Sequence, residues 1–318
     1  MKDNVFVIQT SNYRWILGHW VRQISKRVPG SSIIWWIPIS FTRSSIFNEL
    51  LKKFPLPKSR AYFFTQPTLF ENYYRNMPKR LEGKSVVLYT HNDDSLGDDL
   101  HQVKVLSKSN KVHFMCSLDR ERLVKSGLAE SKCRTILGAV DTNCFKILDL
   151  ERRKNSILLS SKFGPRKGGD ILHELIKAMP DWSFTIFGTG WEEYIHDNGL
   201  DSYSNFSYIL WDENARNRLM STHAIFLSLS KLEGGPIPLI EALNCGMFAI
   251  STDTGFARDL IVDGTNGSIL PIGADIKKVT SAILDAKLNE DQSIKSVSEL
   301  SWDRLARLYL RDALKEVS

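Results

Sequence analysis

Residues 223–246 restrict the possible folds more than any other stretch of this chain. An apolar run at 223–229 is typical of a buried strand. The glycine pair Gly234 and Gly235 then predicts a tight turn that a ligand can approach closely. Gly246 fits a helix stop, because glycine takes the left-handed conformation at a helix C-terminus at little cost. The stretch therefore predicts a strand, a glycine loop and a helix.

The start of this predicted helix has the chemistry of a sugar-nucleotide site. Pro236 has the preset φ of a turn or a helix start, and N–H groups near Gly235 and Ile237 would meet phosphate at the positive dipole end. Glu233 falls in the loop and Glu241 about one turn or more into the helix, and each carboxylate can accept hydrogen bonds from a pair of sugar hydroxyls. Taken alone, the two glutamates also fit a solvated surface helix.

The run from Ser228 to Leu270 resembles the signature of the retaining, two-Rossmann-domain (GT-B) glycosyltransferases of glycosyltransferase family 4. The resemblance implies an α/β fold of two Rossmann-like domains facing a cleft, with the last helix crossing back to the first domain. The matching residues, in chain order, are Ser230, Glu233, Gly234, Pro238, Glu241 to Leu243, Cys245, Gly246, Phe248 to Ser251, Gly255 and Asp263 to Gly267.

Short apolar runs, among them the predicted strands Ala61 to Phe64 and Ser85 to Tyr89, alternate with helical patterns along the N-terminal half, which predicts βαβ units and a parallel sheet. We predict an acceptor-side domain at 1–147, a nucleotide-sugar-binding domain at 148–300 and a final helix at 301–318 that packs on the first domain. The entry to the linker, Gly138 to Phe145, resembles the corresponding family segment, with Gly138 and Ala139 where Asn and Gly are usual.

A basic loop follows the first predicted strand of the second domain. Its sequence, Ser161 to Gly168, is similar to the family's Gly-Arg and Lys-Gly motif, with Lys162 in the place of Arg. The resemblance implies that Lys162 and Lys167 hold the donor's diphosphate and stabilise the charge that develops on the leaving group. Arg166 is a further candidate, and a solvated basic loop is the alternative for the motif by itself.

Three more residues are predicted near the nucleotide. Gly188 follows a strand where the family has Gly-x-Gly, and Trp211 ends the next strand, where the family binds the base; core packing is the alternative role for Trp211. Gly18 closes a loop at 11–18 beyond the first strand, the side on which open α/β sheets bind ligands, and the resemblance implies that a glycine of this loop lies near the donor phosphates and the acceptor. This loop has no Gly-x-Gly-x-x-Gly, so a dinucleotide-binding dehydrogenase is disfavoured.

His91 follows an apolar strand, and the resemblance implies that it contacts the transferred sugar. The acidic loop after it, residues 92–99, lacks Asp-x-Asp, and the family generally needs no divalent metal, so no metal site is predicted. Asp98 and Asp99 can instead start a helix, where acidic side chains are favourable. Asp94 or Asp99 would otherwise orient an acceptor hydroxyl.

The positive charge is concentrated in the first half of the chain. Residues 1–150 carry 23 Lys and Arg against 13 Asp and Glu, whereas residues 151–318 carry 19 against 23. The basic half fits an anionic membrane surface or an acidic acceptor, and simple solubility explains it equally well. Nucleic acid is not expected, because no nucleic-acid-binding motif accompanies the charge.

The four cysteines show no Cys-x-x-Cys spacing, which argues against a zinc site or a disulfide framework and for a reducing compartment. The first apolar run, at 5–8, is expected to be a strand and not a signal peptide. The longest apolar run, at 33–39, is far short of the ~20 residues that span a bilayer. We therefore expect a cytoplasmic protein, one that could be peripheral at the inner face of the cytoplasmic membrane.

These features predict a glycosyltransferase, and the family resemblance implies that it retains the anomeric configuration and needs no metal ion. It would use no cofactor and would move a sugar from a UDP- or GDP-linked donor to a hydroxyl of a glycan or lipid-linked acceptor. One alternative is a sugar-nucleotide epimerase of the same fold, which needs no acceptor. Another is a non-catalytic carbohydrate- or nucleotide-binding protein, against which the intact Glu233, Glu241 and Lys167 argue.

Overall fold

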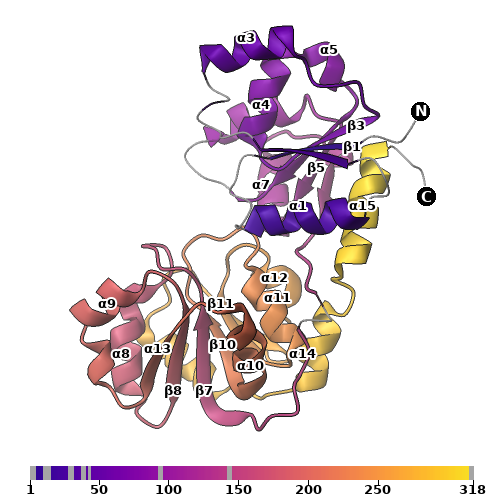
Figure 1. Cartoon of the computed structure of the whole chain (residues 1–318). Coiled ribbons are helices and arrows are strands. Elements are labelled where there is room, and N and C mark those ends of the chain that lie inside the picture. Colours follow the sequence, from indigo (N-terminus) through magenta and orange to yellow (C-terminus); the bar gives the residue numbers. More distant parts are fainter. Residues whose placement is uncertain are drawn as a thin grey trace. The chain divides into compact units, whose positions relative to one another are not determined.

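The computed structural model describes residues 5–9, 16–27, 32–36, 41, 44–91, 96–141 and 145–314, which belong to two compact units (Figure 1). Unit 1 comprises Met1–Leu137 and Trp302–Ser318, and unit 2 comprises Gly138–Ser301. The first division precedes the boundary predicted at 147/148, and the second lies beside the one predicted at 300/301. The two segments that join the units meet within unit 2, where Val140 N donates to Leu300 O over 2.9 Å.

Unit 1 contains a six-stranded parallel sheet in the order β2-β1-β3-β4-β5-β6. The strands are β1 (Val5–Gln9), β2 (Ser32–Trp36), β3 (Ala61–Phe64), β4 (Ser85–Tyr89), β5 (Lys111–Phe114) and β6 (Cys133–Thr135). In the register of the sheet, Val5 pairs with both Ser32 and Ala61. The direction in which strands are added changes between β1 and β3, so the topological switch point of this sheet lies there.

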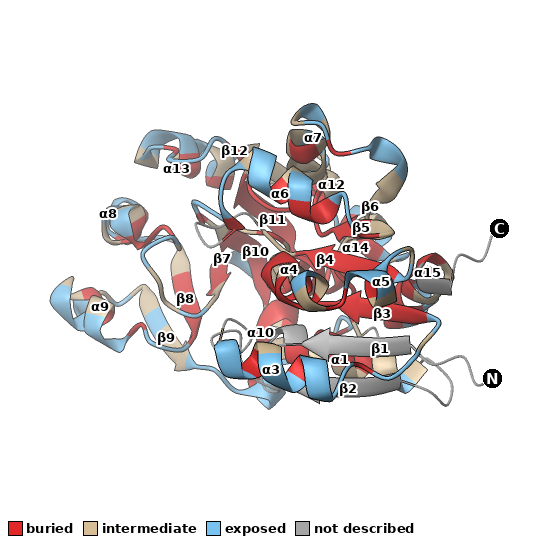
Figure 2. Ribbon diagram, turned by 90° about the horizontal axis from the view of Figure 1, so that it is seen from above, coloured by how far each residue is buried: buried red, intermediate tan, exposed pale blue. Residues whose placement is uncertain are grey.

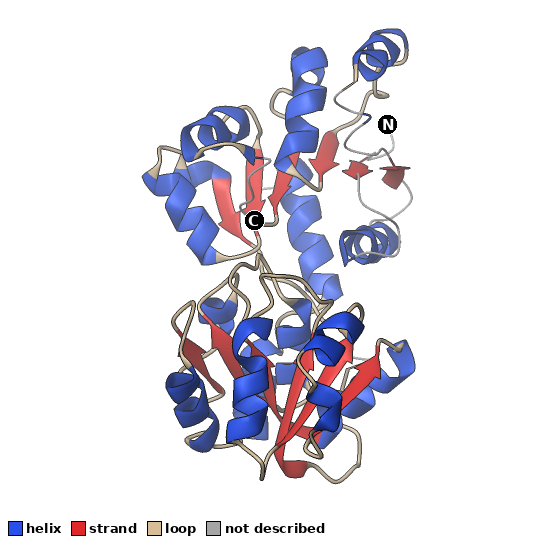
Figure 3. Ribbon diagram, turned by 90° about the vertical axis from the view of Figure 1, so that its left-hand side faces the viewer, coloured by secondary structure: helices blue, strands red, loops and turns tan. Residues whose placement is uncertain are grey.

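Helices lie on both sides of this sheet (Figure 3). They are α1 (Ile16–Arg27), α3 (Ser45–Lys53), α4 (Pro67–Asn76), α5 (Pro78–Leu81), α6 (Asp99–Leu106), α7 (Ser117–Lys125), the 3-10 turn η2 (Glu130–Lys132) and α15 (Trp302–Leu314). Helix α4 was not predicted, although Pro67 at its start and the helical spacing of its buried side chains Leu69, Phe70 and Tyr73 indicate a helix.

The last helix, α15, packs on unit 1, as the fold prediction requires. The Trp302 ring meets the edge of Trp20 from α1 at 5.5 Å between centroids. Further along the helix, the Tyr309 ring lies 4.8 Å from the rings of both Phe63 and His113. All these rings are buried, so α15 completes the core on its face of the sheet.

Unit 2 contains a second parallel sheet, with strands in the order β12-β11-β10-β7-β8-β9. Its strands are β7 (Arg153–Ser160), β8 (Ser183–Gly188), β9 (Phe206–Leu210), β10 (His223–Ser228), β11 (Phe248–Thr252) and β12 (Gly267–Leu270). Counted within the unit, this is the doubly wound order 3-2-1-4-5-6, in which the switch point lies between the first and fourth strands. The switch point of unit 2 is therefore the gap between β7 and β10.

The helices of unit 2 also cover both faces of its sheet. They and the 3-10 turns are η3 (Gly169–Ile171), α8 (Leu172–Ala178), α9 (Glu192–Asp197), η4 (Leu200–Ser202), α10 (Glu213–Thr222), α11 (Ile237–Asn244), α12 (Ala257–Leu260), α13 (Ile276–Leu284) and α14 (Glu290–Val297). The helices after the first two strands, α8 and α9, lie on one side with α13, whereas α10, α11 and α14 lie on the other (Figure 1). Strands β10 and β11 are buried almost throughout, and the edge strand β9 is half exposed (Figure 2).

Across the described ranges of both units, no helix combines the length and the apolar character needed to cross a bilayer.

Candidate functional site

Two loops of unit 2 meet at the switch point of its sheet. One follows β7 and carries the predicted cations, and the other follows β10 and carries Glu233. The second loop is bound to the first by Lys231 N, which donates to Arg166 O over 2.7 Å. A Cβ on Gly168, whose φ is +74°, would lie 2.4 Å from Leu229 O, so only glycine permits this approach. The two loops are therefore held together by contacts between backbone atoms.

The structure pairs two of the predicted site residues directly. Lys167 Nζ, from the loop after β7, donates to Glu233 Oε1, and their side chains are 17% and 10% exposed. Because both groups are largely withdrawn from water, the pair holds each side chain in place more firmly than a surface ion pair does. The other predicted cation, Lys162, is exposed on the same loop, as is Arg166.

Helix α11 begins and ends as the sequence predicts. Pro236 is its N-cap, and Leu239 N donates to Pro236 O over 2.8 Å. Pro238 carries no N–H, so Ile237 is the first-turn donor best able to meet an anion. At the other end, Gly246 has φ +79° and its N–H donates to Leu243 O over 3.0 Å, which confirms the left-handed helix stop.

Glu241 lies in the second turn of α11 and is only 4% exposed. Its Oε1 is 3.5 Å from Nη1 of Arg216 on α10, and its Oε2 has no hydrogen-bond partner among the described residues. Burial raises the pKa of Glu241 to about 7, although the nearby Arg216 opposes the shift. A buried carboxylate with an unused oxygen is energetically unfavourable unless a ligand donates to it.

Arg216 is a site residue that sequence reasoning missed. Its guanidinium lies 4.4 Å from the centre of the Phe145 ring, and its Nε is buried without a partner among the described residues. Phe145 belongs to the linker motif noted in the sequence, but the position of Arg216 carries no family motif. Only the packing of α10 beside α11 brings it to Glu241.

The strand ends beyond β7 bring Gly188 and Trp211 to the same edge of the sheet. Trp211 N donates to Gly188 O over 3.0 Å, and the Trp211 side chain is 48% exposed, so it is not the core residue of the alternative interpretation. A Cβ on Gly188 would lie 1.8 Å from Ser161 O, the residue before Lys162. The predicted base-side residues therefore lie next to the cation loop.

The remaining predicted residues, His91 and Gly18, belong to unit 1. His91 follows β4 and is half-buried. Helix α1 begins at Ile16, so Gly18 lies buried in its first turn, and not in the predicted loop. Residues 11–15 and Asp94 lie outside the described residues.

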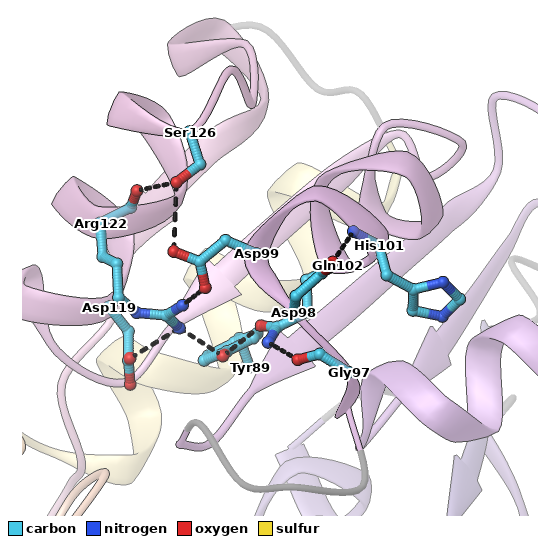
Figure 4. Close-up of polar contacts among 9 residues, drawn as sticks. All are labelled: Tyr89, Gly97, Asp98, Asp99, His101, Gln102, Asp119, Arg122 and Ser126. Carbon is cyan, nitrogen blue, oxygen red and sulfur yellow. Dashed lines mark hydrogen bonds and ion pairs between the residues drawn. The ribbon is translucent and has the colours of Figure 1, made fainter.

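A polar network holds the two ends of the segment that contains His91 (Figure 4). Before the segment, Tyr89 Oη donates to Gln102 Oε1 over 2.6 Å and accepts from Arg122 Nη2 over 2.7 Å. After it, Gln102 Nε2 donates to Gly97 O over 2.8 Å. Both ends are therefore attached to Gln102, which is buried in α6.

The same network explains the acidic residues at the start of α6. Asp98 is the N-cap of the helix and accepts from His101 N over 2.7 Å, as predicted for a helix start. Asp99 forms an ion pair with Arg122, and it accepts from Ser126 Oγ over 3.2 Å. Its carboxylate thus serves the network, which argues against the alternative role of orienting an acceptor hydroxyl.

This chain is similar in sequence to known proteins that transfer sugars. The model of a family described as glycosyl transferases group 1 matches residues 141–299, half of the chain. A phosphatidylinositol N-acetylglucosaminyltransferase subunit from Arabidopsis thaliana is 28% identical over 59% of this chain and 46% of its own length. The lipopolysaccharide 1,6-galactosyltransferase of Salmonella typhimurium is 22% identical over 63% of this chain and 59% of its own length. The chain thus spans about half the length of these curated relatives.

Solved structures share the complete architecture. Sucrose-phosphate synthase from Thermosynechococcus elongatus superposes with a TM-score of 0.76 at 13% identity and covers 97% of both chains. Anabaena HepE, solved in complex with UDP, has a TM-score of 0.76 at 12% identity and covers 99% of this chain and 100% of its own. At such identities the likeness establishes the fold, which is the predicted GT-B arrangement of two Rossmann-like domains.

Proposed function

Because this chain belongs to the glycosyl transferases group 1 family, we propose that it transfers a sugar from a nucleotide-diphosphate sugar to a hydroxyl group of an acceptor. The observation that carries the proposal is the meeting of the Lys167 and Glu233 loops at the switch point of unit 2. Open α/β sheets bind their ligands at this place. Cations for a diphosphate and carboxylates for hydroxyls are what a sugar nucleotide requires.

In the proposed complex, each part of the donor has its own group of residues. Lys162 and Lys167 hold the diphosphate, together with the N–H groups of Gly235 and Ile237 at the start of α11. Glu233 accepts from hydroxyls of the sugar, and Glu241 accepts from the ribose. The diphosphate of the donor would take over part of the charge that Lys167 now shares with Glu233.

We propose retention of anomeric configuration and no requirement for a metal ion. The acceptor hydroxyl attacks the anomeric carbon on the face from which the diphosphate leaves, and a diphosphate oxygen takes the hydroxyl proton. Lys162 and Lys167 stabilise the leaving charge, and His91 of unit 1 contacts the transferred sugar. Nuclear magnetic resonance of the product distinguishes retention from inversion, and turnover in excess EDTA tests the independence from metal.

UDP is the first donor nucleotide to test, because HepE was solved with UDP and UDP-glucose. Thermal unfolding is measured with UDP, GDP, ADP, CMP and NAD on the wild type and on Glu241→Ala. A ligand at 100 times its Kd adds about 2.7 kcal/mol of stability. We expect UDP or GDP to stabilise the wild type, and we expect the same nucleotide to stabilise Glu241→Ala much less. Stabilisation by NAD alone, or by no nucleotide, would contradict the proposal.

The proposed acceptor is a glycan or a lipid-linked molecule, reached at the inner face of the cytoplasmic membrane. Unit 1 carries 26 Lys and Arg against 14 Asp and Glu, whereas unit 2 carries 16 against 22. A positive surface is attracted to anionic lipid headgroups within a Debye length. An acceptor assay with a soluble and a lipid-linked form of the same glycan separates the two classes.

A further inference from the structure

Helix α3 of unit 1 presents a stripe of large apolar side chains to solvent. Ile46, Leu50 and Phe54 are 64%, 41% and 74% exposed. They are successive fourth residues, so they lie along one side of the helix and its C-cap. Figure 2 draws most of α3 in the colour of exposed residues. We call these three side chains the apolar stripe.

The apolar stripe is not part of the core of unit 1. The core takes Phe47 and Leu51 from α3, both buried, and the Phe47 ring lies 5.1 Å from the ring of Tyr73. The apolar arc of the helix is therefore wider than the surface that covers it. A helix of a globular protein normally turns charged or polar residues toward water.

Positive charge accompanies the apolar stripe. Residues 41–60 contain five Lys and Arg and one acidic residue, Glu49. Lys52 pairs with Glu49 over 2.6 Å, while Lys53 and Lys58 are exposed. A second copy of this chain would bring two positive surfaces together, which charge repulsion opposes. An anionic surface complements it.

We propose that α3 docks this protein on a lipid bilayer that contains anionic phospholipids. The apolar stripe enters the boundary between headgroups and acyl chains, and Lys53 and Lys58 meet the lipid phosphates. A ridge of separate side chains suits a fluid bilayer, because a rigid protein partner would need a matching groove. The inference deepens the membrane association proposed above and names the surface responsible for it.

Flotation with vesicles tests the proposal on the full chain. Vesicles of phosphatidylcholine alone are compared with vesicles that also contain phosphatidylglycerol. We expect the wild type to float with the anionic vesicles and the double variant Ile46→Ser, Phe54→Ser to lose about tenfold in partition. For the double variant Lys53→Gln, Lys58→Gln, we expect partition onto the anionic vesicles to fall about fivefold for each lysine removed. This loss should be smaller in high salt, because salt screens the attraction between lysine and lipid phosphate. Leu284→Ser, in α13 of unit 2, is the control, because Leu284 is an apolar side chain of similar exposure, 63%, outside the apolar stripe.

Equal recovery of the wild type with both kinds of vesicle would overturn the proposal. Equal recovery of the control and the α3 variants would also overturn it. So would a wild-type dimer, detected by sedimentation, that becomes monomeric in the α3 variants. Stabilisation by UDP or GDP is measured on the same samples. Variants that float poorly but keep this stabilisation are folded and affected only in docking. A chain that floats yet binds no nucleotide would contradict the proposed function and leave the docking surface intact.

Discussion

The two sheets of this protein have parallel strands, but their carboxyl ends are held in different ways. In unit 2, the loops beyond β7, β8 and β10 contact one another through backbone atoms, and Gly168 and Gly188 leave no room for a Cβ. In unit 1, the segment beyond β4 is held by side chains, chiefly Tyr89, Gln102 and Arg122. The first arrangement allows few residue types, whereas the second allows many.

This difference gives a physical reason for the match between the family model and unit 2. A backbone contact requires glycine at a fixed position, so it leaves a mark in the sequence. A network of side chains can be replaced by another that satisfies the same groups. The family model accordingly matches residues 141–299, all of which lie in unit 2.

The largest effect that would test this contrast is expected from Lys167→Met. If the strand ends of unit 2 carry the donor chemistry, removal of this cation lowers kcat/KM by 10²–10³, or about 3–4 kcal/mol. Steady-state kinetics with the UDP sugar measures the change. Lys177→Met, an exposed lysine of α8, is the matched control and should stay near wild type. Equal losses in both variants would remove Lys167 from the site.

Gly188→Ala tests the backbone contact itself. The added Cβ would meet Ser161 O, so the strand ends must move apart, and we expect a loss of about 3 kcal/mol in the free energy of unfolding. Urea denaturation measures it. Gly164→Ala is the control, because no atom lies within 4 Å of the place that its Cβ would take, and it should change stability little. A stable Gly188→Ala protein would show that the edge is not tightly packed.

Arg122→Leu tests the side-chain arrangement of unit 1. It removes the partner of Asp99, Asp119 and Tyr89, and because Arg122 is 28% exposed we expect a loss of only about 2 kcal/mol. Binding of UDP should not change, whereas transfer should weaken if His91 is displaced. Arg120→Leu, which breaks one pair with the exposed Glu130, serves as the control. Loss of UDP binding in Arg122→Leu would contradict the proposal that unit 2 alone binds the nucleotide.

The smallest effect concerns pH. The folded-state pKa of Glu241, about 7, lies above the usual 4.5, so the protein without ligand loses stability as pH rises through this interval. Ribose hydroxyls donate to the ionised form, so the affinity for UDP should rise about tenfold between pH 6 and pH 8. Calorimetric titration of the wild type and Glu241→Gln checks this. An equally steep pH dependence in Glu241→Gln would assign it to another group.

Arg216 sharpens the same test. Its removal in Arg216→Leu takes away the cation that opposes the pKa shift of Glu241, so the pH dependence should move to higher pH. Arg216→Lys should bring the pH dependence part of the way back toward that of the wild type. Lysine keeps the positive charge but lacks the planar, two-pronged donor group of arginine.

Local patterns in the sequence were sufficient for much of the fold. The bounds of β3 and β4 match their predicted bounds, since buried apolar runs between polar segments leave little choice. The start and end of α11 follow from Pro236 and Gly246, whose backbone restrictions are local. The alternation of strands and helices was enough to predict the parallel sheet of unit 1, whereas the sheet of unit 2 was predicted from the family resemblance.

Features that depend on distant contacts could not be predicted. Lys167 and Glu233 are 66 positions apart, and no local sequence pattern predicts that they form an ion pair. Arg216 meets Glu241 only because α10 packs beside α11, and the helix start at Ile16 moved Gly18 out of its expected loop. The roles assigned to the site residues stay predictions that the variants above address.

The return of α15 to unit 1 has a consequence for the order of events during synthesis on the ribosome. Unit 1 is made of two separate pieces of the chain, with the whole of unit 2 between them. Trp302 and Tyr309 leave the ribosome after unit 2, so the Trp20 and Phe63 side of unit 1 stays uncovered until then. Unit 2, which is continuous, can fold as soon as it emerges, and unit 1 is completed last although its synthesis starts first.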